Sequence, residues 1–64
     1  MDFNATNIRQ AEDIGRKCAR AMTHNDIGLF NHWRKVFRGL LLIATNKAEL
    51  ESAYDRAYRE ESGQ

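Results

Sequence analysis

The chain has 64 residues, so we expect a single small domain spanning residues 1–64. Ten Lys and Arg residues against nine Asp and Glu residues leave a formal net charge of +1, which excludes the strongly basic composition of a general polyanion binder. Proline is absent and Cys18 is the one cysteine, which excludes an internal disulfide and argues against a turn-rich β fold.

The first predicted helix covers residues 5–23, where apolar residues recur with helical spacing. Asn4 and Asn7 are both candidate caps for its start. The expected buried face consists mostly of small residues, which let a neighbouring helix approach closely. Its members are Ile8, Ala11, Ile14, Gly15, Cys18, Ala19, Ala21 and Met22.

The second predicted helix covers residues 27–44, and Asp26 is a suitable N-cap for it. Its apolar side is wide and bulky, with two parallel ridges. The first ridge, with the step of a coiled-coil seam, is Leu29, Trp33, Val36, Leu40 and Ile43. The second ridge is Phe30, Phe37, Leu41 and Ala44. We therefore expect one ridge to face the rest of the chain and the other to face a second copy. The alternative is a compact monomer that encloses this helix completely. The predicted core and dimer residues are Leu29, Phe30, Trp33, Val36, Phe37, Leu40, Leu41 and Ile43.

The third predicted helix covers residues 47–61 and opens with a capping box from Asn46 to Glu49. It has little apolar mass, and its inner face is Leu50, Ala53, Tyr54, Ala57 and Tyr58. Three cations against five acids make this helix acidic, whereas the first two helices are basic. Short connections between such helices favour an all-α, antiparallel, up-down-up three-helix bundle that dimerises through its second helix.

Opposite charges four residues apart predict local ion pairs on the outer sides of the first and third helices. These pairs are Glu12–Arg16, Asp13–Lys17, Asp55–Arg59 and Arg56–Glu60.

No group of residues has the pattern of an active site. Cys18 lies on the buried side of its helix, and His24 falls in the following loop, more than a turn away. His24 and His32 are eight residues apart, and one cysteine completes no zinc-ligand spacing. A glycine-rich phosphate loop is also absent from the sequence. We therefore expect no enzymatic activity, no metal and no cofactor.

The longest apolar run, Leu40 to Ala44, is far shorter than a membrane span requires. No signal-peptide pattern precedes the first helix, and a lone cysteine suits a reducing compartment. We therefore expect a cytoplasmic protein without a membrane partner.

Nucleic acid is the alternative partner. Basic residues occupy the outer sides of the first two helices, and together they form one strip if the helices pack side by side. The alternative nucleic-acid-binding residues are Arg16, Lys17, Arg20, Arg34, Lys35 and Arg38. The acidic third helix argues against this interpretation, because it would repel phosphates from the place of a recognition helix.

The preferred interpretation is a homodimeric protein-interaction module that binds, and inhibits or modulates, a partner protein. Polar, basic and aromatic residues typical of interfaces are the predicted contacts. They are Asn31, His32, Arg34, Lys35, Arg38, Leu42, Tyr54 and Tyr58. Very small helical proteins without catalytic motifs are common among the accessory proteins of phages and mobile elements, which is an analogy of size and class only.

Overall fold

The computed structural model describes residues 3–63, of which Phe3 is described by its backbone alone. These residues form three α-helices, α1 (Phe3–Thr23), α2 (Ile27–Ile43) and α3 (Lys47–Glu61), without a strand in the described range. The predicted three-helix, all-α fold is therefore confirmed. α1 begins two residues earlier than predicted, α2 ends one residue earlier, and α3 has the predicted bounds.

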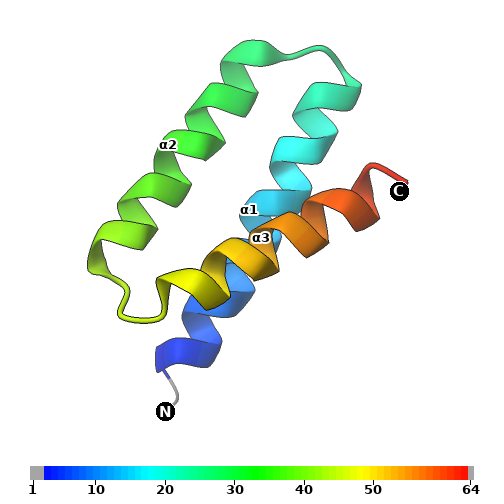
Figure 1. Cartoon of the computed structure of the whole chain (residues 1–64). Helices are drawn as coiled ribbons and strands as arrows, with labels where there is room; N and C mark the ends of the chain where they lie inside the picture. Colours follow the sequence, from blue (N-terminus) through cyan, green and yellow to red (C-terminus); the bar gives the residue numbers. More distant parts are fainter. Residues whose placement is uncertain (1–2, 64) are drawn as a thin grey trace.

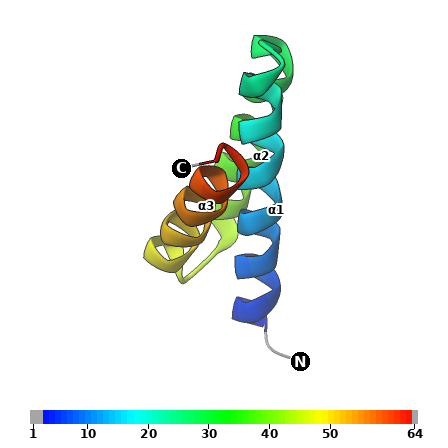
Figure 2. The same cartoon turned by 90° about the vertical axis from the view of Figure 1, so that its right-hand side faces the viewer.

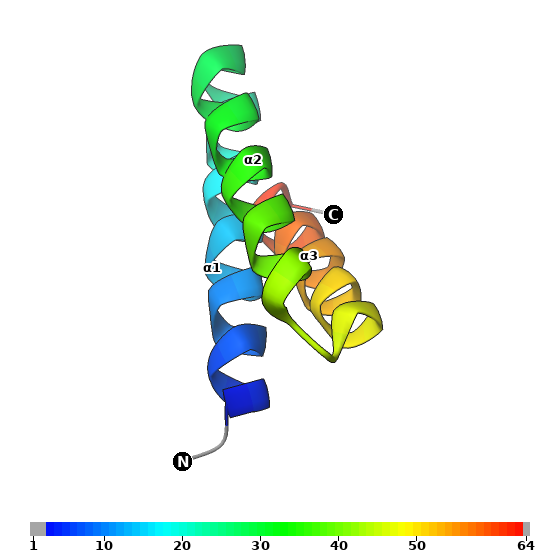
Figure 3. The same cartoon turned by 90° about the vertical axis from the view of Figure 1, so that its left-hand side faces the viewer.

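The helices lie in two layers. α1 and α2 run side by side, and α3 crosses in front of α1 at an oblique angle (Figure 1). Turned by 90° in either direction, the molecule shows α3 on one side of the layer that α1 and α2 form (Figures 2 and 3). The backbone of α1 lies close to both other helices, whereas the backbones of α2 and α3 come close at few points, and side chains such as Phe37 and Tyr54 join them. α1 is thus the central helix, and one side of the α1–α2 layer has no helix over it.

The turn between α1 and α2 is closed by two capping arrangements. Asn25 has a left-handed backbone with φ of 55° and donates its N–H to the Met22 carbonyl, while the Asp26 N–H reaches the Ala21 carbonyl. These two bonds make a Schellman motif, in which asparagine takes the position usual for glycine. The Asp26 side chain then accepts a hydrogen bond from the Leu29 N–H at 3.0 Å. The prediction of Asp26 as the N-cap of α2 is confirmed.

The asparagine caps predicted for α1 are wrong, and the one predicted for α3 is right in position only. Asn4 and Asn7 both lie inside α1, because the helix already begins at Phe3. Asn7 is only 2% exposed, and its side-chain nitrogen has no hydrogen-bond acceptor in the described chain. Asn46 does occupy the N-cap position of α3, but its side chain makes no capping hydrogen bond. The predicted capping box is therefore absent.

The core lies where α1 meets the other two helices. Its buried residues are Ala11, Ile14, Cys18, Phe37, Leu40, Ala44, Leu50 and Ala53. The predicted inner face of α1 is buried except for Ile8, which is half-buried, and Met22, which is exposed. Small residues matter most at Gly15, where an added Cβ would lie 2.5 Å from the Tyr54 carbonyl oxygen. The backbones of α1 and α3 are therefore in close contact, as the small-residue pattern of α1 predicts.

Two of the four predicted ion pairs are confirmed and two are wrong. Asp13–Lys17 closes at 2.9 Å and Asp55–Arg59 at 3.1 Å. Glu12 and Arg56, assigned by the sequence to local partners, instead pair with each other across the α1–α3 contact at 3.6 Å. A further interhelical pair, which spacing along one helix does not predict, joins Arg20 to Glu61 at 3.3 Å.

Candidate protein-interaction surface on helix α2

The structure splits the first predicted ridge of α2. Trp33 and Leu40 turn inward, where Trp33 is half-buried under the Lys17 ammonium, 4.4 Å from its ring centroid, and Leu40 joins the core. Leu29, Val36 and Ile43 remain exposed, Ile43 by 68%. We call these three residues, spaced seven apart, the apolar stripe. The first ridge therefore does not face one way as a whole, because two of its five residues pack against the chain's own core.

The second predicted ridge faces inward. Phe37 and Ala44 are buried, and Phe30 and Leu41 pack half-buried against the core. The predicted set of core and dimer residues is thus divided by burial: five residues serve the core and three form the apolar stripe.

A groove of about 350 Å³ runs between the apolar stripe and α1. Its lining residues are Gln10, Asp13, Ile14, Val36, Gly39, Leu40 and Ile43. Gly39 leaves its wall open, because no atom lies within 4 Å of the position that a Cβ would take. Sequence reasoning did not find this groove, since the α1 contribution depends on the packing of the two helices. A glycine in the middle of an otherwise bulky helix was the available signal.

A second groove of about 280 Å³ lies on α2 alone and is basic. Asn31, Arg34, Lys35 and Arg38 line it, and we call these four residues the basic cluster. α2 contains no Asp or Glu, and no ion pair among residues 3–63 includes a member of the cluster. The cluster was predicted from the shared helical side of these residues, and the structure places them together.

Tyr54 links the basic cluster to the core. The Arg34 guanidinium lies 5.2 Å from the centroid of the Tyr54 ring, and this ring also stacks with Phe37 and Tyr58. Burial, together with a hydrogen bond to Cys18, raises the pKa of Tyr54 to about 12, although Arg34 acts in the other direction. The Tyr54 hydroxyl therefore stays protonated at neutral pH.

The remaining predicted contact residues differ in exposure. His32 and Leu42 are exposed on α2, Leu42 by 81%, and His32 meets Trp33 edge-on at 5.1 Å between centroids. Tyr54 and Tyr58 are half-buried against the core. The two tyrosines thus belong more to the core edge beneath the α2 surface than to the exposed surface itself.

The predicted nucleic-acid residues of α1 do not join the basic cluster in one groove. The basic groove is lined by α2 alone, and α1 and α2 turn their buried faces toward each other. Lys17 is engaged by Asp13 and Trp33, and Arg20 by Glu61. Arg16 is half-buried and has no ion pair in the described chain.

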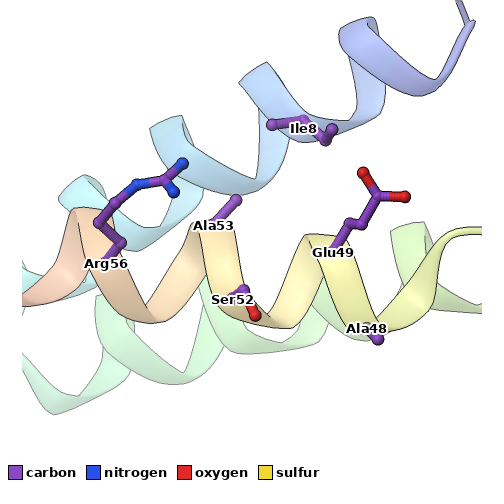
Figure 4. A pocket seen from close by; sticks show the side chains of 6 residues that line it. All are labelled: Ile8, Ala48, Glu49, Ser52, Ala53 and Arg56. Atoms are coloured by element: carbon purple, nitrogen blue, oxygen red, sulfur yellow. The ribbon is translucent and has the colours of Figure 1, made fainter.

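A third groove, of about 330 Å³, lies between α1 and α3 (Figure 4). The Glu49 and Arg56 side chains extend toward α1 on either side of Ala53, with Ile8 facing them from α1. Ala48 and Ser52 complete its lining. The groove thus carries one charge of each sign, and Arg56 is already engaged by Glu12.

We looked for a reactive thiol and for possible metal ligands among residues 3–63. Cys18 is fully buried, and residues 3–63 contain no group of three or more His, Cys, Asp or Glu side chains placed to hold a metal ion. None of the three described helices has the length and apolarity needed to cross a bilayer. Comparison with protein-family models, curated proteins and solved structures finds no match to this chain. Functional inference therefore depends on the geometry and chemistry of the α2 surface.

Proposed function

We propose that this chain is a small, non-enzymatic protein-interaction module that forms a homodimer through α2 and binds a partner protein, which it inhibits or modulates. The observation that supports this proposal is the apolar stripe of Leu29, Val36 and Ile43, exposed beside a groove that α1 and α2 line without α3. Grouped apolar exposure on a small chain is typical of protein interfaces.

A second copy of the chain suits the stripe because the stripe is symmetric about its middle residue. Val36 lies seven residues from both Leu29 and Ile43. An antiparallel copy of α2 centred on Val36 therefore places Leu29 opposite Ile43 twice, as a two-fold interface requires. The open wall at Gly39 leaves space for an opposing side chain. A second copy also supplies apolar burial that a core of this size lacks.

The proposal includes three further features that the sequence favours. We propose an antiparallel, up-down-up bundle in each subunit, and a cytoplasmic location, which a single free cysteine favours because it suits a reducing compartment. A role as a regulator of the accessory-protein type found in phages follows by analogy of size and class.

Sedimentation of the wild type and a Val36→Asp variant tests the dimer. We expect the wild type to sediment at roughly twice the 7.4 kDa chain mass at micromolar concentration. Val36→Asp places two opposed carboxylates at the centre of the interface and should leave a monomer. Leu42→Asp is the matched control, because it makes the same kind of change at an exposed position of α2 outside the stripe. A wild type that sediments as a monomer contradicts the proposal, as does an equal effect of the two variants.

The alternative function is a small DNA- or RNA-binding regulator that uses the basic residues of α1 and α2. The observation that favours it is the basic cluster, whose three cations have no acidic partner in the described chain. A gel shift that weakens steeply as salt rises would support this function. The absence of a shift at low salt removes it.

A further inference from the structure

We infer that the basic cluster, Asn31, Arg34, Lys35 and Arg38, is a docking site for an acidic segment of a partner protein, whose carboxylates it binds. This inference rests on the proposed function, since it names the chemistry of the partner that the module binds. It concerns a different side of α2 from the apolar stripe, so the two sites are tested separately.

The ion pairs of the described chain leave the cations of α2 without acidic partners. Among residues 3–63, the four ion pairs engage Lys17, Arg20, Arg56 and Arg59, all on α1 or α3. Residues 27–48 contain no Asp or Glu at all, so the cations of α2 have no acidic residue within their own helix. The chain therefore balances its charge on α1 and α3 and leaves three neighbouring cations on α2 available to an external anion.

The geometry of the cluster carries the second step. Positions 31, 34, 35 and 38 follow the three- and four-residue spacing that places side chains on one helical side, and together they line one groove. The Arg34 guanidinium is held over the Tyr54 ring, which is itself stacked against Phe37. An arginine restrained in this way loses less conformational freedom on binding, and its planar group matches a carboxylate with two parallel hydrogen bonds.

The surroundings of the cluster favour a protein over a nucleic acid. Leu42 lies four residues after Arg38, one helical turn further along, and is 81% exposed. A protein segment offers both carboxylates for the cations and apolar side chains for Leu42, whereas a phosphate backbone offers only anions. Strong phosphate binding also needs many cation contacts, and two of the three α1 cations predicted for it, Lys17 and Arg20, are already paired.

A peptide titration tests this inference. The probe is a fluorescein-labelled helical peptide whose Glu residues recur every three or four positions beside Leu, and the same peptide with Gln for Glu is its control. Fluorescence anisotropy should show binding of the Glu peptide at low salt and none of the Gln peptide. Each of Arg34→Gln, Lys35→Gln and Arg38→Gln should weaken binding roughly fivefold or more, as expected for central contacts of an interface.

Two matched variants separate a specific site from general charge. Arg9→Gln removes one positive charge from an exposed position of α1 and should leave peptide affinity unchanged. Arg16→Gln removes one charge from the other predicted basic group, so it should matter only for a nucleic acid spread over both helices. Circular dichroism checks that each variant remains helical. Arg34→Lys keeps the charge but removes the planar guanidinium group, so it tests whether that group contributes to peptide affinity.

Three results overturn the inference. The first is no binding of the Glu peptide, and the second is an equal loss of affinity in Arg9→Gln and the cluster variants. The third is tighter binding of a labelled DNA duplex than of the peptide, with Arg16→Gln as damaging as Arg38→Gln. Sedimentation of the same samples keeps the proposals apart. If the chain is a dimer and does not bind the peptide, only the docking site is overturned. If the chain is a monomer and binds the peptide, only the dimer is overturned.

Discussion

The contact between α1 and α3 differs from the outer side of α2 in the size of its residues and in whether its charged side chains form ion pairs. Where α1 meets α3, small residues bring the helices so close that Gly15 has no room for a Cβ, and the Glu12–Arg56 and Arg20–Glu61 pairs join the two helices. On the outer side of α2, large apolar residues are exposed and the cations have no acidic partner within residues 3–63.

This difference indicates a division of labour within a very small chain. Close packing at Gly15 and the interhelical ion pairs join α1 and α3, so this contact supports the fold. α2 contributes Phe37 and Leu40 to the core from one side, and its other sides carry exposed residues. Exposed apolar and unpaired charged groups do not stabilise an isolated chain, which is why we assign them to binding.

The largest expected effect contrasts one leucine from each region. Leu50 on α3 is fully buried, whereas Leu42 on α2 is 81% exposed. Leu50→Ala should lower the free energy of unfolding by about 3 kcal/mol, because it removes buried methyl groups and leaves a cavity. Leu42→Ala should change it by less than about 0.5 kcal/mol. Urea denaturation followed by circular dichroism, at one fixed protein concentration, measures both values.

Similar losses for the two leucines would show that Leu42 is buried in the protein in solution. A loss at Leu42 that grows with protein concentration would place it within the dimer interface, outside the apolar stripe to which we assign that interface.

Two glycines give the next effect, with opposite signs. Gly15→Ala forces a Cβ against the Tyr54 carbonyl oxygen and should cost about 1–2 kcal/mol, because the overpacking exceeds the gain in helix propensity. Gly39→Ala meets no atom of its own chain within 4 Å and should stabilise the monomer by about 0.5–1 kcal/mol, measured below the concentration at which it dimerises. Thermal and urea unfolding of both variants measure the difference. Stabilisation by both substitutions would contradict the close contact of α1 and α3.

The sequence was sufficient to predict the helices and much of their inner faces. Periodicity defined α2 and α3 to within a residue, since clear start signals, Asp26 before α2 and Asn46 before α3, precede them. The start of α1 was less clear, because Asn4 and Asn7 both have the chemistry of a cap, and neither acts as one. The close packing of α1 was predictable, since Gly15 and its alanine neighbours share one side of the helix and small residues let another helix approach closely.

The sequence did not determine which ridge of α2 faces inward. Both ridges are apolar, so a helical wheel gives no preference between them. The choice depends on the position of α2 against α1, which turns Trp33 and Leu40 in and leaves Val36 out. The basic cluster was predictable because its residues share one helical side. The support of Arg34 by Tyr54 was not, because it joins residues of two helices that are distant in sequence.

Interhelical charge gives the smallest expected effect. Glu12 and Arg56 approach to 3.6 Å, with 26% of the Glu12 side chain and 59% of the Arg56 side chain exposed. Water screens such a pair, so a double-mutant cycle with Glu12→Gln and Arg56→Gln should give a coupling energy of about 0.2–1 kcal/mol that falls as salt rises. The cycle for Asp55 and Arg59, which pair within α3, is the control for a purely local ion pair.

The Glu12–Arg56 coupling energy also depends on Glu60, because Glu60 lies four residues after Arg56 and can compete for the same guanidinium. If Arg56 pairs across the α1–α3 contact, Glu60→Gln should leave the Glu12–Arg56 coupling nearly unchanged. If the local pair predominates in solution, the Glu12–Arg56 coupling should be close to zero and should appear only once Glu60 is neutralised. The second result would mean that close packing at Gly15, without help from charge, makes α1 and α3 specific for each other.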